Sequence, residues 1–350
     1  SPVPVRYWEV GNEVYGAKPS AGAGCAPFGW EDVWTCDGST YVNGDSDHDG
    51  FLAFRSAMQA VDPTILVGAV GVARPNDWSN WGTDVINATA GHLDFYSIHE
   101  YGFGKVPDPA KVAPVPFKIW PTVMSDTEAA FAASSPGGQV PIAVTEYNLA
   151  AMQDDDPGQL MTKATNALFL ADMIGQMAVH GVVIANQWNL LNGRAANGTD
   201  YGMISADNGT RSPQFYALVM WAKFGETLVP VTSPSKADEL SVYASTSSDG
   251  SVTVLAVNKT GQTVVQPLTV DGWAAVSSVT IDALTAPSAD ATTVSLNGSS
   301  NATDSLAEHH PQMLGGSLMP LTAQFAPHSI TVLRLAATGK ASTASSPSSR

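Results

Sequence analysis

The sequence carries little charge. Asp, Glu, Lys and Arg together make up 14% of the 350 residues, whereas soluble domains typically contain roughly 25%. The 32 acidic residues outnumber the 16 basic ones, which gives a formal net charge of −16 at pH 7. Nucleic-acid binding needs a basic face, so this charge argues against a nucleic-acid partner. It is compatible with a neutral, hydroxyl-rich ligand such as a sugar.

Long apolar runs are missing as well. The most apolar stretch, residues 164–185, is interrupted by Asp172, Gln176 and His180. This spacing is typical of an amphipathic helix that leads into a strand, so we expect no membrane span. The sequence begins without Met and without a signal peptide, and we therefore expect a processed or clipped chain.

Cysteine is scarce. Cys25 and Cys36 are the two cysteines, and they have no nearby pair of histidines with which to form a zinc site. A local disulfide is the preferred interpretation, and two free thiols are the alternative. Six Asn-x-Ser/Thr sequons permit N-glycosylation, although a chain so rich in Asn and Thr contains some by chance. They begin at Asn87, Asn197, Asn208, Asn258, Asn297 and Asn301. Together these features favour secretion.

Apolar strand runs alternate with helical patterns up to about residue 225, as in a parallel sheet covered by helices. The expected strands are residues 5–12, 65–72, 93–101, 140–148 and 182–190. The expected helices are Phe51–Val61 and residues 78–90, 124–133, 160–180 and 212–225. We expect Ser212 to cap the last helix, with Pro213 at its first position.

The pattern changes after residue 225. Period-two alternation with the turn signals SSDG and NKTG predicts an antiparallel β-sandwich over residues 226–337. Residues 338–350 are low in complexity, and we expect a disordered tail. The predicted domains are therefore residues 1–225, residues 226–337 and the tail.

Polar side chains follow the apolar runs where four of the predicted parallel strands end. These runs end in NE, HEY, EYN and QWN, and in a β/α barrel such ends gather at the mouth that holds the active site. Cleavage of a glycosidic bond needs two facing carboxylates. One protonates the leaving oxygen, and the other attacks the anomeric carbon or activates water. Glu13 and Glu146 lie three β/α units apart, so we expect them to face each other across the mouth.

Two of these motifs resemble a known group. YWEVGNE is similar to the acid/base strand of retaining glycoside hydrolases of clan A, in particular the α-L-arabinofuranosidase-like families, and PIAVTEYN is similar to their nucleophile strand. YSIHEY and APHSITVLRL also match this group. The resemblance covers residues 3–337. It implies strands four to eight of a (β/α)8 TIM barrel followed by an all-β sandwich, without a cofactor or a metal.

The resemblance also implies roles for the two carboxylates. Glu13 becomes the general acid/base and Glu146 the nucleophile of a double displacement. We expect the neighbouring carboxylate to raise the pKa of Glu13, and we expect Glu146 to stay ionised.

Further site residues follow from the same comparison. Asn12 is expected to hydrogen-bond the sugar 2-hydroxyl, His99 or Tyr101 to tune the nucleophile, and Trp188 to stack on the sugar ring. The alternatives are a structural histidine for His99 and a core aromatic for Trp188. Glu100 is expected to point away from His99, because side chains alternate along a strand.

The expected activity is retaining hydrolysis of polysaccharides or oligosaccharides, with an α-L-arabinofuranoside as the first substrate expectation. An endo-acting β-glucanase or xylanase on the same scaffold is the alternative within this class. A catalytically silent carbohydrate-binding protein is the alternative from another class.

The segment DSDHDG resembles the start of a calcium loop. The twelfth position counted from Asp45 is Ser56, however, where an EF-hand requires a bidentate Glu. An acidic turn that caps the helix Phe51–Val61 is the better interpretation.

Five parallel strands would leave an open sheet edge and an exposed core. We therefore expect barrel strands one to three on a second polypeptide left by proteolytic cleavage, or in another part of the gene product.

Overall fold

The structure is a computed structural model that describes residues 4–16, 37–106, 108–134, 138–302, 305–306 and 309–338. The chain divides into two compact units. The first comprises Ser1–Gly102, Pro116–Asn148 and Gln176–Trp188. The second comprises Phe103–Val115, Leu149–Gly175 and Asn189–Arg350. In the described part of the chain, no helix has the length and apolarity needed to cross a membrane.

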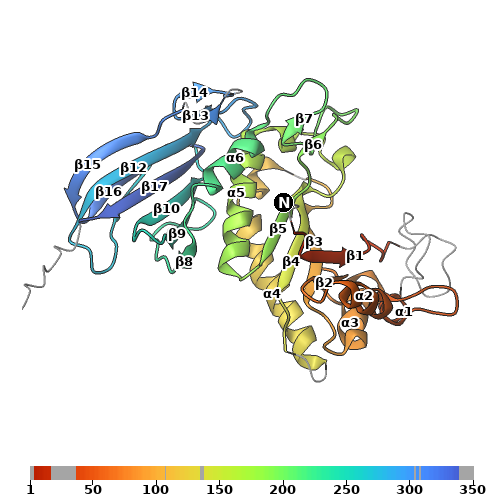
Figure 1. The fold of residues 1–350 in the computed structure, drawn as a ribbon. Coiled ribbons are helices and arrows are strands. Elements are labelled where there is room, and N and C mark those ends of the chain that lie inside the picture. Colours follow the sequence, from red (N-terminus) through yellow and green to blue (C-terminus); the bar gives the residue numbers. More distant parts are fainter. Residues whose placement is uncertain are drawn as a thin grey trace, which may run out of the picture. The chain divides into compact units, whose positions relative to one another are not determined.

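A curled parallel sheet organises the first part of the chain, with its five strands in sequence order (Figure 1). The strands are β1 (Tyr7–Val10), β2 (Leu66–Val70), β3 (Phe95–Phe103), β4 (Ile142–Ala150) and β5 (Ile184–Gln187). Each lies within or next to a predicted strand run. Because the strands are parallel, their carboxyl ends meet at one edge of the sheet, which is where the polar motifs of the sequence lie.

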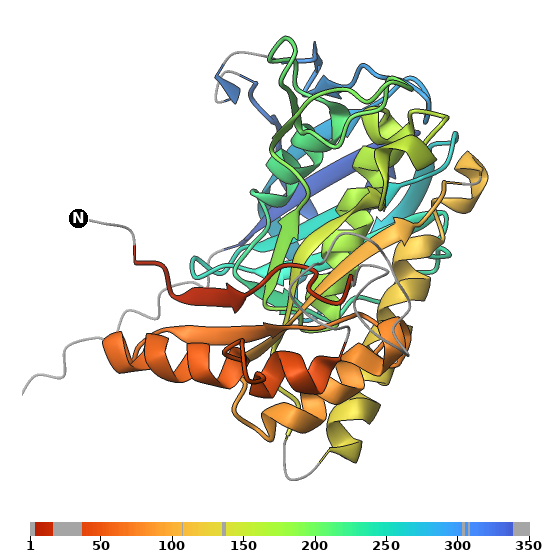
Figure 2. The ribbon, with the colours of Figure 1, turned by 90° about the vertical axis from the view of Figure 1, so that its right-hand side faces the viewer.

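Helices follow these strands in a β/α pattern. They are α1 (Gly38–Asn43), α2 (Phe51–Val61), α3 (Asp77–Thr89), α4 (Val115–Ala133) and α5 (Ala164–Val179). Figure 2 shows α1–α3 on one side of β1 and β2. Two glycines of β2 and its extension make room for aromatic rings, because a Cβ on Gly68 or Gly71 would lie within 2.5 Å of the Phe95 or Tyr96 ring. The apolar run that predicted β2 therefore also determines how β3 packs beside it.

Helix α4 begins well before its predicted start at residue 124. Pro116 lies in the first turn, where no intrahelical N–H is required, whereas Pro121 lies inside the helix. The amphipathic pattern therefore showed only the C-terminal half of this helix.

One predicted helix cap holds in part and the other is wrong. Ser212 is the N-cap residue of helix α6 (Pro213–Trp221), with Pro213 in the first turn as predicted, but the Ser212 hydroxyl donates to the carbonyls of Gly202 and Met203 and makes no cap hydrogen bond. Helix α2 begins after Gly50, and it has no acidic residue in its first turn. Asp45 instead accepts hydrogen bonds from the N–H groups of residues 47 and 48, so DSDHDG closes a turn of its own.

The second unit contains the antiparallel sheets. The main sheet has eight strands, with β14-β13-β12-β17-β10-β9-β8 in spatial order and β15 paired to β12, while β11 and β16 pair separately. Their bounds are β8 (Thr227–Val229), β9 (Leu240–Thr246), β10 (Val252–Asn258), β11 (Val264–Leu268), β12 (Ala275–Thr285), β13 (Ser295–Leu296), β14 (Ser299–Ser300), β15 (Gln312–Leu318), β16 (Leu321–Phe325) and β17 (Ser329–Ala337). The shorter elements are β6 (Leu191–Asn192), β7 (Ile204–Ser205), η1 (Pro109–Lys111), η2 (Gln153–Asp155) and η3 (Leu160–Thr162).

Strand β10 of the main sheet is buried on both faces. Alternate residues of β10 divide between two cores: Val254 packs with Phe325 of β16, whereas Leu255 packs with Tyr216 of α6 and with α5 residues such as Leu168. The period-two alternation of the sequence thus corresponds to two buried faces, because a strand turns successive side chains to opposite sides.

A buried ion pair links α5 to the end of β10 within this unit. The Lys259 Nζ lies 2.6 Å from the Asp172 Oδ2, and both side chains are almost fully buried. The ammonium also donates to the Ser241 hydroxyl and the Ala237 carbonyl, while Asp172 accepts from the Tyr243 hydroxyl. The charges are thus neutralised and hydrogen-bonded, as buried charges require.

We expect Lys259→Met to lower the free energy of unfolding by about 3–5 kcal/mol, because it leaves the Asp172 carboxylate buried without its cation. Lys163→Met is the matched control. Lys163 pairs at 3.2 Å with Asp290, which is largely exposed, and its loss is expected to cost less than about 1 kcal/mol. Urea unfolding of the variants measures both effects. Equal losses for the two variants would contradict the structural role of Lys259.

Candidate active site

Glu13 occupies a strained position just beyond β1. The strand ends at Val10, and Glu13 lies in the following turn with a φ of 48°. Residues other than glycine seldom adopt a positive φ, and when they do, the strain is often found at a functional site. The Glu13 carbonyl accepts from the Gly16 N–H, and its carboxylate accepts from the Tyr15 hydroxyl at 3.1 Å. The turn thus fixes both the backbone and the side chain of this acid.

Alternate residues of β3 contribute the next groups. The His99 Nδ1 lies 2.9 Å from the Glu13 Oε1 and 3.4 Å from the Glu146 Oε2. The Tyr101 hydroxyl, two residues along, donates to the Glu146 Oε2 at 2.7 Å. His99 and Tyr101 therefore share one face of the strand, and both contact the predicted catalytic carboxylates.

Glu146 lies where the pairing of β4 and β5 becomes irregular. The register shifts between Val144 and Tyr147. Such bulges often occur beside active sites, because the extra residue changes the direction of a side chain. Here the irregularity brings the side chains of two successive residues, Thr145 and Glu146, into contact with side chains of β3. One ligating atom each of Glu13, His99 and Glu146 lies within 4.8 Å of the other two.

A polar group adjoins this cluster. The Ser97 hydroxyl donates to the Glu9 Oε1 at 2.7 Å and lies 2.6 Å from the Thr145 hydroxyl. Burial raises the pKa of Glu9, and its hydrogen bond from Ser97 opposes that effect only in part. The sequence interpretation missed Glu9, Ser97, Thr145 and Tyr15. For Glu9, Ser97 and Thr145 the available signal was a polar residue inside an otherwise apolar strand run, whereas Tyr15 lies in the turn after β1.

The pKa of Glu13 shifts in the direction opposite to that predicted. Burial raises the pKa of Glu13, but the hydrogen bonds from His99 and Tyr15 and the charge of His99 outweigh burial and lower it overall. Burial raises the pKa of Glu146, and the charge of His99 and the Tyr101 hydroxyl offset this only in part. The prediction of a raised pKa for Glu13 is therefore wrong for this state of the site, because His99 is hydrogen-bonded to Glu13.

His99 lies between the carboxylates, and their negative charges favour its protonated form. Burial lowers its pKa, but the hydrogen bond to Glu13 and the negative charges of Glu146, Glu13 and Glu9 raise it overall. A carboxylate can only accept hydrogen bonds, so the His99 Nδ1 is the donor when Glu13 is ionised. The cluster therefore holds a proton within reach of Glu13.

The other predicted site residues lie outside this hydrogen-bonded cluster. Asn12 is exposed at the turn before Glu13. Trp188 is 42% exposed, and its carbonyl accepts from the Asn148 side chain at 2.5 Å. Both are open to solvent and free to meet a ligand. Cys25 and Cys36 lie outside the described residues.

Glu100 points away from the cluster, as expected. It is 5% exposed, and its carboxylate lies 3.3 Å from the Arg74 guanidinium. Burial raises the pKa of Glu100 to about 7, although the charge of Arg74 opposes this effect. Glu100, although it follows His99 in the sequence and has a raised pKa, therefore lies outside the cluster of Glu13, His99 and Glu146.

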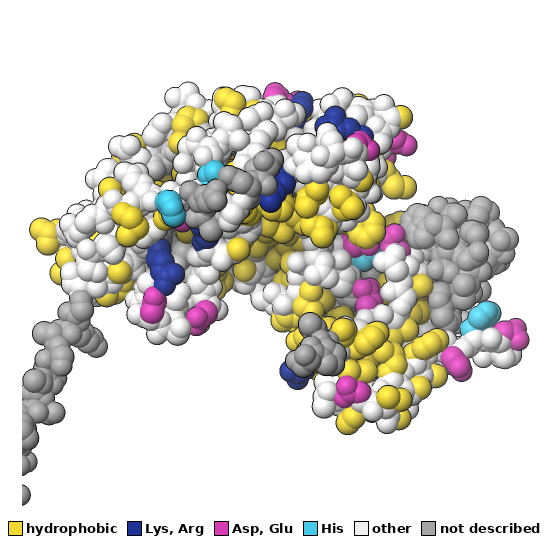
Figure 3. All heavy atoms as spheres, turned by 45° about the horizontal axis from the view of Figure 1, so that its top comes forward, with side chains coloured by type: hydrophobic (Ala, Val, Ile, Leu, Met, Phe, Trp, Pro, Cys, Tyr) yellow, Lys and Arg dark blue, Asp and Glu magenta, His cyan; other side chains and the backbone are white. Residues whose placement is uncertain are grey.

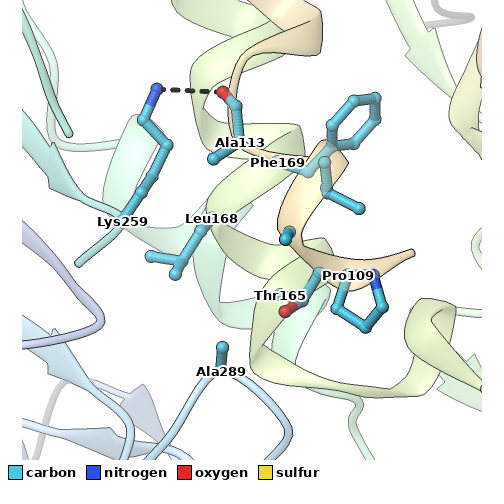
Figure 4. Close-up of a pocket in the computed structure, with 9 residues that line it drawn as sticks. Pro109, Ala113, Thr165, Leu168, Phe169, Lys259 and Ala289 are labelled. Atoms are coloured by element: carbon cyan, nitrogen blue, oxygen red, sulfur yellow. Dashed lines mark hydrogen bonds between the residues drawn. The ribbon is translucent and has the colours of Figure 1, made fainter. Parts of the chain in front are cut away.

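The second unit has a pocket of about 270 Å³ near η1 and α5. Figure 4 shows Phe169 and Leu168 at this pocket and the Lys259 ammonium directed towards the Ala113 carbonyl. Its lining residues include no carboxylate, and Lys259 is already paired with Asp172. The pocket therefore lacks a pair of carboxylates such as Glu13 and Glu146. Among the described residues on the face shown in Figure 3, the Lys and Arg side chains are scattered.

Comparisons with known proteins identify the fold. No family model and no curated protein sequence matches the chain. The α-L-arabinofuranosidase from Thermotoga maritima, in an arabinose complex, is 22% identical with a TM-score of 0.68, over 94% of this chain and 66% of that one. The GH51 α-L-arabinofuranosidase from Thermotoga petrophila RKU-1 is 20% identical with a TM-score of 0.65, over 94% and 66%. CelM2, a bifunctional glucanase-xylanase protein from a metagenome library, is 17% identical with a TM-score of 0.57, over 82% and 59%.

The chain thus has the fold of part of these enzymes. It spans just under two thirds of the length of the two arabinofuranosidases. The resemblance inferred from YWEVGNE and PIAVTEYN is confirmed as a likeness in fold: a parallel partial barrel joined to antiparallel sheets.

We expect the stability of the protein to depend on Glu100 between about pH 4.5 and pH 7. The pKa of Glu100 is raised in the folded state, so the stability it contributes is complete below the unfolded pKa and is lost as the pH rises through about 7. Glu100→Gln does not titrate. Relative to the wild type, this variant should therefore gain roughly 2–3 kcal/mol between pH 5 and pH 8.

Urea unfolding at both pH values measures this change, and Glu128→Gln, an exposed position on α4, is the control. A Glu100→Gln difference that is the same at both pH values would show that the carboxyl of Glu100 does not titrate in this window.

Proposed function

We propose that the protein is a retaining glycoside hydrolase in which Glu146 is the nucleophile and Glu13 the general acid/base. The observation that carries this proposal is the approach of the two carboxylates, whose nearest ligating atoms lie within 4.8 Å of each other. Retaining glycosidases hold their carboxyl groups roughly 5 Å apart, whereas inverting enzymes need about 6.5–9.5 Å to accommodate a water molecule. The spacing therefore supports direct attack by one carboxylate on the sugar.

The proposed reaction has two steps. The Glu146 carboxylate attacks the anomeric carbon and forms a glycosyl ester, while the bond to the leaving oxygen breaks and that oxygen takes a proton from Glu13. Glu13, now ionised, removes a proton from a water molecule that attacks the same carbon. The ester bond breaks, the sugar leaves with its original configuration, and Glu146 becomes a carboxylate again.

His99 and Tyr101 fit this scheme as groups that position and charge the acids. The Tyr101 hydroxyl stabilises the ionised form of Glu146, which is the form that attacks. His99 shares its proton with Glu13. A sugar ring that covers the cluster removes water from it, which disfavours the charged pair of His99 and Glu13 and moves the proton towards the glutamate. Glu13 thus becomes an acid when substrate is present.

The proposed substrate is an α-L-arabinofuranoside of a polysaccharide or oligosaccharide. Two of the similar structures are arabinofuranosidases, and the acidic, sparsely charged composition suits a neutral ligand. Asn12 would bind the 2-hydroxyl and the exposed Trp188 would stack on a sugar ring. An endo-acting glucanase or xylanase is the second candidate, because CelM2 is a glucanase-xylanase with a similar fold.

We also propose that β1 to β5 are strands four to eight of a barrel that further strands complete. Among the described residues, β1 pairs only with β2 and β5 only with β4. Apolar side chains at these edges are exposed, among them Tyr7 at 44%, Trp8 at 43% and Val183 at 51%. Unpaired edges with exposed apolar groups favour pairing with additional chain.

Two alanine variants test the mechanism on aryl α-L-arabinofuranosides. Glu13→Ala should still cleave substrates with very good leaving groups, and added azide should give a glycosyl azide of retained configuration. Glu146→Ala should be inactive without azide and should give an inverted azide with it, because azide then replaces the nucleophile. If Glu13→Ala gave the inverted azide and Glu146→Ala the retained one, the roles of the two glutamates would be reversed. Turnover by Glu146→Ala at the wild-type rate would show that Glu146 takes no part in the reaction.

The same assay decides the substrate class. Wild-type protein is compared on aryl α-L-arabinofuranosides, β-D-xylosides and β-D-glucosides, with Tyr7→Phe as a variant outside the acid cluster. Sugar binding without turnover of any glycoside would support the carbohydrate-binding alternative.

Purified from its source, the active protein is expected to contain strand-forming sequence in addition to residues 1–350, in the same polypeptide or in a second one. Peptide mapping and intact mass measure this. An active preparation that consists of residues 1–350 alone would contradict the completed barrel.

A further inference from the structure

The six sequons differ sharply in what their asparagine side chains do in the folded chain. N-glycosylation joins a bulky, hydrophilic glycan to the side-chain nitrogen Nδ2. A folded protein can carry that glycan only where Nδ2 faces solvent. Sequons therefore mark surface loops when they are used, and the hydrogen bonds of each asparagine decide which of them qualify.

Three of the asparagines use Nδ2 inside the fold. Asn258 is fully buried, and its Nδ2 donates to the carbonyls of residues 262, 325 and 326. Asn197 donates to the carbonyls of residues 153 and 156. Asn297 donates to the Asp282 carboxylate and to the carbonyl of residue 309. A glycan on any of these nitrogens would break the bonds and displace the packed chain around them.

Two further sequons are poorly presented. Asn87 is exposed, but it lies in the last turn of α3, and the hydroxyl of its partner Thr89 is buried and bonded to the Ile86 carbonyl. Asn301 is half-buried, and its side-chain oxygen accepts from the Val294 N–H. In both, the local structure holds part of the sequon in the fold.

Asn208 lies at the tip of a tight turn that follows β7. The Ser205 N–H donates to the Thr210 carbonyl and the Gly209 N–H to the Ser205 carbonyl, which closes the turn. Residues 206–210 are all exposed, and Gly209, with a φ of 70°, has open space where a Cβ would be. The Asn208 Oδ1 accepts from the Thr210 N–H at 2.9 Å, so the Nδ2 on the same amide is directed away from the backbone that it caps.

We propose that Asn208 is the N-glycosylation site of this protein and that Asn197, Asn258 and Asn297 stay unmodified in the folded chain. The co-substrate is a glycosyl donor whose sugar C1 is linked to phosphate, together with its transferase. The Asn208 Nδ2 attacks C1, the N–C1 bond forms and the C1–O bond to phosphate breaks. The phosphate leaves with the electron pair, and the amide gives one proton to the transferase. This inference is independent of the proposed hydrolase activity.

The test treats the purified folded protein with a soluble N-glucosyltransferase and UDP-glucose, and follows all six sequons by peptide mass spectrometry. We expect Asn208 to be modified at least about tenfold faster than Asn197, Asn258 and Asn297, because each of those three must first break two or more hydrogen bonds. The same transferase acting on peptides from a Glu-specific protease, which leaves all six sequons intact, is the control. There the difference should disappear, since peptides have no fold to protect them.

Asn208→Gln removes the fast site, and it should leave the unfolding midpoint unchanged because the side chain is exposed. When the protein is expressed through a secretory pathway, the wild type should carry a glycan at Asn208. The corresponding increase in mass should be absent from the Asn208→Gln variant. An unmodified Asn208 in the folded protein, or a glycan on any of the three bonded asparagines, would overturn the assignment. A preference for Asn208 that persists in the peptides would also overturn it, because the preference would then come from sequence and not from the fold.

Discussion

Two carboxylates whose oxygens lie within 4.8 Å of each other repel unless a positive charge is placed beside them. His99 lies between them, with Nδ1 at 2.9 Å from Glu13 and 3.4 Å from Glu146, and the charges of the acids favour its protonated, positively charged form. The electrostatics of the acid pair depend on this contact. It lowers the pKa of Glu13, and the hydrogen bond to Glu13 and the charges of the acids raise the pKa of the imidazole.

The contact of His99 with the two acids depends on a strained backbone conformation at Glu13 and on an irregular strand pairing at Glu146. Glu13 has a positive φ beyond the end of β1, and Glu146 lies at a register shift of β4. A regular strand would turn Thr145 and Glu146 to opposite faces. The shift lets Thr145 join Ser97 and Glu9 while Glu146 meets Tyr101. The strands thus carry a layer of polar contacts next to the acids, and regular pairing could not produce it.

The sequence predicts the parts of this arrangement that depend on periodicity. Apolar runs that end in NE, HEY and EYN located β1, β3 and β4 and placed Glu13, His99 and Glu146 at one edge of a parallel sheet. It could not predict which carboxylate His99 would bond, because that depends on a turn conformation at Glu13 and a bulge at Glu146. The predicted pKa of Glu13 failed for this reason. The cap of α6 shows the same limit: Ser212 is the N-cap residue as predicted, but its hydroxyl donates to the carbonyls of residues 202 and 203.

The segment SIHEYG of β3 shows how narrowly the site is determined. His99 and Tyr101 face the acids, whereas Glu100, between them, is buried on the other face against Arg74. A slip of one residue would exchange the two faces. It would place Glu100 between the two carboxylates and remove the His99 imidazole from between them. The Glu100–Arg74 pair is therefore more than a partner for a buried carboxylate. A register shift of β3 would break this pair and destabilise the fold, so the pair helps to keep the His99 imidazole between the two acids.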